Sequence, residues 1–171
     1  MEFYDVIRTR RSIRSYKKDP VPEDALERIL DAARIAPSGH NRQKWKYYVV
    51  RDPRKLEELA EACGGQSWIA QAPMAIVSTG WRVGFNRGGY MGEMSFIMDV
   101  AISFTHLILA ARAEKLGTCW IGDFDNEEVK KVLGIEGEEE VVAVTPLGYP
   151  DQAAFRPIKN RKPLDEIVEG L

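Results

Sequence analysis

The amino-acid sequence predicts an α+β fold in which helices surround a mainly antiparallel or mixed β-sheet. The chain has 171 residues, 44% hydrophobic and 29% charged, which is typical of a folded globular protein. Segments of helical and strand character are mixed without the steady strand–helix–strand repeat of a parallel sheet. One long apolar segment suits a central helix. We expect one domain over residues 1–171, with an arm at about 151–171 that has too few apolar residues for its own core.

Local patterns define the elements of the first half of the chain. Apolar residues recur at helical spacing in three segments, and aromatic and β-branched residues gather in two others. Pro22 followed by Glu23 and Asp24 marks a helix start, since acidic side chains interact favourably with the positive end of a helix dipole. The expected elements are a short helix containing Phe3, Val6 and Ile7, a helix from Pro22 that stops before Pro37, a strand at Trp45–Val50, a helix ended by Gly64-Gly65, and a strand at Met74–Thr79.

The second half is dominated by a helix predicted from about Glu93 to Leu116. It is apolar on nearly all sides, as in a helix buried on most faces, and Asp99 would be costly in a lone membrane span. We therefore expect a core or subunit-interface helix. The other expected elements are a mobile glycine-rich loop at 82–92, a strand at Thr118–Ile121, a helix at Asn126–Leu133 closed by Gly134, a solvated acidic turn at Glu136–Glu140, a strand at Val141–Leu147 and a final helical turn or two.

Composition disfavours several classes of function. Lys and Arg number 24 and Asp and Glu 26, whereas nucleic-acid and membrane-surface proteins usually carry a large excess of one sign. Two cysteines and two histidines are too few for a metal site rich in these residues or for a disulfide framework. The first residues lack an apolar signal core, so we expect a cytoplasmic protein. Because GxGxxG, GxxxxGK[ST], GxSxG and HExxH motifs are missing, an enzyme of this sequence would rely on a cofactor.

The segment Arg8–Arg14 is the first candidate for binding chemistry. It contains four arginines and two hydroxyl side chains within seven residues. Guanidinium groups bind phosphate oxygens through paired hydrogen bonds, and a serine can donate another. In an extended segment Arg10, Ser12 and Arg14 would project to one side. The pattern suits a phosphate beside a polar ring edge, and the alternative is a solvated basic patch that pairs with nearby acids.

Three further segments are candidates, each with a plain structural alternative. Ala36–Trp45 is either a simple turn or a loop whose amide side chains recognise the edge of a heterocycle. Leu116–Asp123 is either a buried strand or a place where Gly122 lets the backbone approach a flat ring. In the tail, Lys159 and Arg161 are either solubilising charges or cations that close over the same phosphate.

Together these segments resemble the nitroreductase family of FMN-dependent flavoproteins. The resemblance rests on RRSIRSY near the N-terminus, APSGHNRQKW at a helix exit, LGTCWIGDF after the long helix, and GYP followed by KNRKPLDEIV. It implies an intertwined homodimer with two FMN molecules at the subunit interface, each held by both chains. One departure is Lys44, which stands where the family often has proline before the tryptophan.

The resemblance also implies cofactor-binding roles for particular residues, with no single catalytic side chain and no metal. They are Arg10, Arg11 and Ser12 at the phosphate and ribityl end, Arg14 near the pyrimidine edge, Pro37, Ser38, Gly39 and Asn41 from the partner chain over the ring, Ile121 and Gly122 with a backbone N–H near flavin N5, and Lys159 and Arg161 at the phosphate.

The activity implied is that of an FMN-dependent oxidoreductase. It would use NADH or NADPH to reduce nitroaromatics, quinones or similar electron-poor acceptors by a ping-pong mechanism. The expected partners are a second copy of the chain and a small-molecule acceptor, with no nucleic acid and no membrane. The alternatives are another flavin reaction on the same fold, such as reductive dehalogenation or flavin fragmentation, and a non-catalytic anion or nucleic-acid binder that uses Arg8–Lys18.

Overall fold

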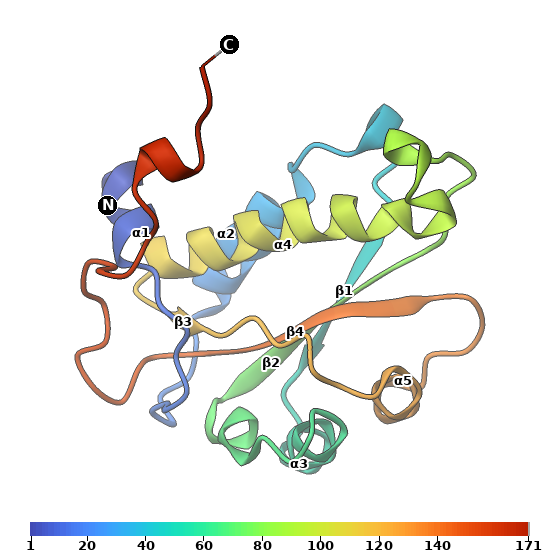
Figure 1. Cartoon of the computed structure of the whole chain (residues 1–171). Helices are drawn as coiled ribbons and strands as arrows, with labels where there is room; N and C mark the ends of the chain where they lie inside the picture. The colour runs from blue at the N-terminus through green and yellow to red at the C-terminus, as the bar shows by residue number, and fades with distance from the viewer. Residues whose placement is uncertain (171) are drawn as a thin grey trace.

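An antiparallel sheet runs through the centre of the computed structural model, which describes residues 1–170 (Figure 1). Its strand order is β1-β2-β4-β3, and every neighbouring pair is antiparallel. The third strand is shorter than predicted, although an isolated bridge from Ile121 to Val144 continues its path along β4. The strands are β1 Trp45–Val50, β2 Met74–Gly80, β3 Gly117–Thr118 and β4 Glu140–Gly148.

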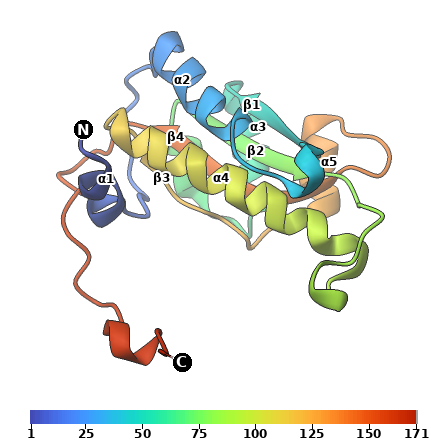
Figure 2. The same ribbon diagram turned by 90° about the horizontal axis from the view of Figure 1, so that it is seen from above.

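Helices cover both faces of the sheet, as predicted for the α+β class. α2 and α4 lie side by side over one face, and α3 and α5 cover the other (Figures 1 and 2). α1 lies beside the C-terminal end of α4 (Figure 1). The helices are α1 Phe3–Thr9, α2 Glu23–Arg34, α3 Pro53–Ala62, α4 Phe96–Ala113 and α5 Asn126–Leu133.

Side chains of β2 alternate between two hydrophobic cores. Met74 and Ile76 pack in the core beneath α2 and α4, whereas Ala75 and Val77 pack in the core beneath α3 and α5. Successive strand residues point to opposite faces, so a strand covered on both sides is buried along its whole length. This explains why the whole of β2 is buried.

The helix ends follow the expected capping chemistry. The Asp52 carboxylate accepts a hydrogen bond from the Lys55 N–H at 3.0 Å, and the Asp125 carboxylate accepts one from the Glu128 N–H at 3.0 Å. α5 ends at Gly134, whose φ of 67° lies in the left-handed region that glycine adopts at little cost. The glycine signal is local, which is why the sequence located the C-terminal end of α5.

α4 is the central helix of the fold. The segment Gly92–Ala113 is long and apolar enough to span a membrane by length and composition alone. Phe96, Phe104 and Leu107 are nevertheless fully buried against the rest of the chain, as in the core helix of a soluble protein. Asp99, which we expected to argue against a span, is itself buried.

Two loop predictions need correction. Glu139, expected in a solvated turn, is buried, and its carboxylate accepts a hydrogen bond from the Thr79 hydroxyl. The acidic run therefore ends in a buried contact at the start of β4. The loop at 82–92, expected to be a mobile surface loop, contains a short 3₁₀ turn at Arg87–Gly89, leads into a second at Gly92–Ser95, and buries Val83.

The C-terminal tail is extended and largely exposed, and it passes beside α1 (Figures 1 and 2). The Ile158 N–H donates to the Arg8 carbonyl at 3.1 Å, and the Asp151 N–H donates to the Ser15 carbonyl at 3.1 Å. A short 3₁₀ turn at Leu164–Glu166 corresponds to the expected final helical turn. These contacts bring the basic residues of the tail next to the arginine-rich N-terminal segment.

Candidate functional site

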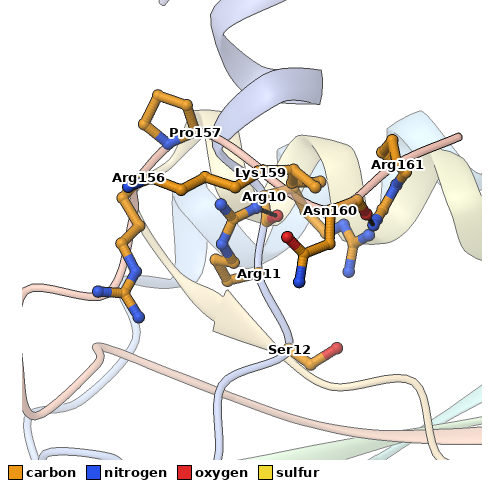
Figure 3. Close-up of a pocket in the computed structure, with 9 residues that line it drawn as sticks. Arg10, Arg11, Ser12, Arg156, Pro157, Lys159, Asn160 and Arg161 are labelled. Carbon is orange, nitrogen blue, oxygen red and sulfur yellow. Dashed lines mark hydrogen bonds between the residues drawn. The ribbon is translucent and has the colours of Figure 1, made fainter. Parts of the chain in front are cut away.

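A pocket of about 640 Å³ lies between the N-terminal arginine segment and the tail (Figure 3). Five of its lining side chains are cations, and Ser12 adds a hydroxyl. The residues that line it are Arg10, Arg11, Ser12, Arg156, Pro157, Ile158, Lys159, Asn160 and Arg161.

The N-terminal wall of this pocket is fixed by the sheet. α1 ends at Thr9, and the following residues run beside β3, where Ser12 forms a parallel bridge with Thr118. The Ile13 N–H donates to the Thr118 carbonyl at 2.8 Å, and the Ile13 side chain is buried. Because side chains alternate, burying Ile13 leaves the exposed Ser12 on the opposite side, facing the tail.

The tail wall is fixed by a buried arginine near the end of α4. The Arg112 guanidinium lies 3.9 Å from the centre of the Phe155 ring, and its Nε donates to the Thr9 hydroxyl at 3.1 Å. A cation over an aromatic face is stabilised by the ring's charge distribution. Arg112 thus holds the start of the tail and the end of α1 together, so that Lys159 and Arg161 face the arginine segment.

The charges of the pocket are not balanced within the described part of the chain. No carboxylate of residues 1–170 forms a salt bridge with any of the five cations. Desolvation lowers the pKa of the Arg11 guanidinium, and the nearby charges of Arg156, Arg10 and Arg161 lower it further. A multivalent anion would relieve this repulsion, and arginine forks with a serine hydroxyl are the donor set that suits a phosphate.

Arg14 is not among the residues that line this pocket. Its side chain is exposed, and its guanidinium lies 5.7 Å from the centre of the Trp68 ring. The predicted alternation therefore holds for Ser12 and Ile13 but does not bring Arg14 into the pocket. Arg11, which alternation would direct elsewhere, lines the pocket instead.

The predicted loop residues Pro37, Ser38, Gly39 and Asn41 lie at the other end of α4. The Gly39 N–H donates to the Asp99 carboxylate at 3.0 Å, whereas the pocket adjoins Arg112. These two residues are 13 positions apart in α4, which corresponds to about 20 Å along a helix. Within one chain, the loop and the pocket are therefore separate.

Ile121 and Gly122 lie just after β3 and have different surroundings. Ile121 is buried, and its backbone exchanges two hydrogen bonds with Val144, at 2.9 and 3.1 Å. Gly122 is exposed, a Cβ built on it meets no atom within 4 Å, and its N–H has no hydrogen-bond partner among residues 1–170. This amide is therefore available to a ligand.

Neither cysteine is suited to act as a nucleophile. Both thiols are buried, and burial raises the pKa of Cys63 to about 12. Burial likewise raises the pKa of Cys119. A thiol with a raised pKa remains protonated and weakly reactive near neutral pH.

Sequence reasoning missed several residues of the pocket. Arg156 and Asn160 were not candidates, although Arg156 belongs to the same basic tail as Lys159. Lys162, the remaining basic residue of that run, forms a salt bridge with Glu166 at 3.8 Å instead. The sign of the charge was visible in the sequence, but the direction of each side chain was not.

The antiparallel sheet with helices on both faces is a nitroreductase-like α+β fold, and comparison with known proteins identifies the family. The model of the nitroreductase family matches residues 7–149. The chain therefore belongs to the nitroreductase family. This membership supports the interpretation of the protein as an oxidoreductase.

Three relatives illustrate the similarity. The chain is 32% identical to an NADH dehydrogenase of Thermus thermophilus, across 93% of this chain and 91% of that protein. It superposes on the FMN-dependent nitroreductase of Clostridium difficile R20291 with a TM-score of 0.77 and 27% identity, covering 92% of this chain and 91% of that one. It is also 26% identical to iodotyrosine deiodinase 1 of Rattus norvegicus, across 98% of this chain and 68% of that protein.

Proposed function

We propose that the protein is an FMN-dependent oxidoreductase that uses NADH or NADPH to reduce nitroaromatics, quinones or similar electron-poor acceptors. The observation that carries the proposal is the pocket of five uncompensated cations and a serine in a chain of this family. When bound, FMN supplies the transfer of two electrons between NAD(P)H and the acceptor. The cytoplasm remains the expected location.

The residues present fit such a cofactor. Arg10, Arg11, Ser12, Lys159 and Arg161 would hold its phosphate and ribityl end, since all of them line one pocket. The free N–H of Gly122 would donate a hydrogen bond to the ring, and the backbone of Ile121 holds that amide in place. The lining residues include no histidine, cysteine or carboxylate. We accordingly assign no catalytic side chain, and the chain's role is to bind, orient and polarise.

The loop Pro37–Asn41 enters the proposal through a second copy of the chain. One bound molecule cannot contact both the pocket and a loop about 20 Å away along α4 of the same chain. In a two-fold dimer packed along α4, the partner's loop could reach the pocket. Exposed apolar side chains suit such an interface: Phe3, Tyr4 and Ile7 on α1, and Ile97 and Met98 on α4.

The visible absorbance spectrum of the purified protein, combined with its mass in solution, tests this proposal. We expect a yellow protein, or one that becomes yellow on reconstitution with FMN, with a mass near twice the 19.3 kDa of one chain. Anaerobic titration with NADH and then NADPH should bleach the flavin. A monomer that takes up no FMN at excess would overturn the proposal.

Arg14 provides a test of the ring end of the site. A cation near the flavin's pyrimidine edge favours the negative charge that develops on reduction, so Arg14→Ala should slow flavin reduction by NAD(P)H about tenfold. Folding should be unaffected because the side chain is exposed. Stopped-flow absorbance measures the rate, and Lys17→Ala, an exposed cation in the same segment, is the control. An unchanged rate in Arg14→Ala would contradict this role.

Reductive dehalogenation is a second candidate, favoured by the relative that is an iodotyrosine deiodinase. The same flavin site would then supply two electrons to a halogenated aromatic ring, which takes up one proton as its carbon–halogen bond is replaced by a carbon–hydrogen bond and halide leaves. Turnover of iodotyrosine and of a nitroaromatic by the same reduced protein would distinguish the two reactions. If the arginine segment were instead a polyanion-binding surface, the protein would be colourless and would bind DNA with a steep dependence on salt.

A further inference from the structure

The buried side chain of Asp99 joins two loops that are distant in the sequence. Asp99 lies in the first turn of α4 and is 1% exposed. Its Oδ1 accepts a hydrogen bond from the Gly39 N–H at 3.0 Å and another from Arg87 Nη2 at 2.5 Å. Gly39 belongs to the 38–43 loop before β1, and Arg87 to the 81–92 loop between β2 and α4.

The 38–43 loop depends on support from outside itself. The φ angles of His40, Asn41 and Gln43 are 53°, 54° and 50°. They lie in the left-handed region, which residues other than glycine rarely adopt. Such a backbone persists only where the surrounding structure holds it. Within the loop, the Ser38 hydroxyl accepts the Gln43 N–H at 3.0 Å, and Asp99 supplies the contact to the core.

The two loops also touch directly, around the ring of Phe85. The guanidinium groups of Arg42 and Arg87 each lie 5.1 Å from its centre, and the His40 ring meets it edge-on at 5.4 Å. At Gly39, a Cβ would lie 2.2 Å from Arg87 Nη2 and 2.7 Å from Phe85 Cζ. The absence of a side chain at Gly39 is therefore what lets Arg87 reach the Asp99 carboxylate.

The ion pair between Arg87 and Asp99 is largely buried. The Arg87 side chain is 17% exposed, and Asp99 Oδ2 is buried with no hydrogen-bond partner among residues 1–170. Removing one member of a buried pair leaves the other uncompensated, so such pairs hold their elements firmly. By contrast, Arg82 of the same loop pairs only at 3.7 Å with Glu93 and Glu140 and is half-exposed.

We propose that Asp99 is a positioning residue that couples the 81–92 loop to the 38–43 loop through Arg87 and Gly39, and that this coupling sets substrate affinity. The inference rests on the proposed function, in which the partner's loop covers the flavin ring, and it places the adjoining 81–92 loop beside the substrate. When the ion pair is lost, both loops loosen together, so reductant and acceptor bind less well. The cofactor phosphate is held elsewhere, by the cationic pocket, and its binding persists.

Arg87→Met tests the coupling without the cofactor. Hydrogen exchange followed by mass spectrometry should show faster exchange in peptides covering 38–43, although the substituted residue is in the other loop. Arg87→Lys should restore much of the protection, and Arg82→Met, the matched control, should leave 38–43 unchanged. Asp99→Asn retains an acceptor for the Gly39 N–H and removes the charge, so it should resemble Arg87→Met. Faster exchange confined to 81–92 would overturn the coupling.

Steady-state kinetics of the FMN-loaded variants tests the consequence. We expect KM for both NAD(P)H and acceptor to rise about fivefold in Arg87→Met, with kcat nearly unchanged and a smaller change in the FMN Kd, because the cationic pocket still holds the phosphate. If Arg87→Met exchanges faster at 38–43 but keeps the KM values of the wild type, the role of the coupling in substrate affinity is overturned. If the wild-type protein binds no FMN, the proposed function fails, and the exchange experiment still decides whether the loops are coupled.

Discussion

Arg11→Gln is expected to weaken FMN binding by at least about tenfold, because charge-assisted hydrogen bonds to a phosphate are among the strongest a side chain makes. Arg11 lines the pocket together with four other cations, so each contributes to a field that favours a dianion. The apoprotein should be no less stable than the wild type, since the substitution removes a cation that is partly desolvated and repelled by Arg156, Arg10 and Arg161, which together lower its pKa. Fluorescence titration of the apoprotein with FMN measures the affinity.

Two controls isolate the phosphate contribution. Arg54→Gln changes the net charge equally but alters an exposed residue of α3 that forms no salt bridge within residues 1–170, and FMN affinity should not change. Riboflavin, which lacks the phosphate, should bind wild type and Arg11→Gln equally weakly. An equal loss of riboflavin and FMN affinity would instead indicate that Arg11 acts by shaping the pocket.

Much of the secondary structure could be predicted because its signals are local. The strand at Trp45–Val50 and the helix at Asn126–Leu133 have the bounds that periodicity and flanking residues indicated. Glu139 was misjudged because its burial depends on the hydroxyl of Thr79, which lies 60 residues earlier in the chain. A run of acidic residues contains no information about which member meets a partner in a neighbouring strand.

The candidate site could be predicted in part, for the same reason. Charge and residue type indicated that the arginine segment and the tail could share one anion, and the structure brings Arg10, Arg11, Ser12, Lys159 and Arg161 to one pocket. Their role toward FMN stays a prediction. Asp99 looked like a mere interruption of an apolar helix, because its partners Gly39 and Arg87 are brought to it only by the tertiary fold.

The wall of the pocket depends on a close approach that a matched pair of glycine substitutions can test. At Gly117, a Cβ would lie 2.7 Å from Ile13 Cγ1 and 2.9 Å from Ile13 Cβ, whereas a Cβ at Gly122 meets nothing within 4 Å. Gly117→Ala must therefore displace Ile13, and overpacking of this kind costs about 1–3 kcal/mol. Gly122→Ala should change the free energy of unfolding by less than about 0.5 kcal/mol.

Gly117→Ala and Gly122→Ala also distinguish an effect on the stability of the fold from an effect on binding at the flavin ring. Ile13 is flanked by Ser12 and hydrogen-bonded to Thr118, so its displacement in Gly117→Ala moves the arginine segment and should lower both stability and FMN affinity. Gly122→Ala leaves the apoprotein intact, so any change in its flavin spectrum or reduction rate would report a contact at the ring. Urea denaturation of the apoproteins and FMN titration provide both measurements. A Gly117→Ala protein as stable as the wild type, with unaltered FMN affinity, would contradict the tight packing of Ile13 on β3 as the support of the pocket wall.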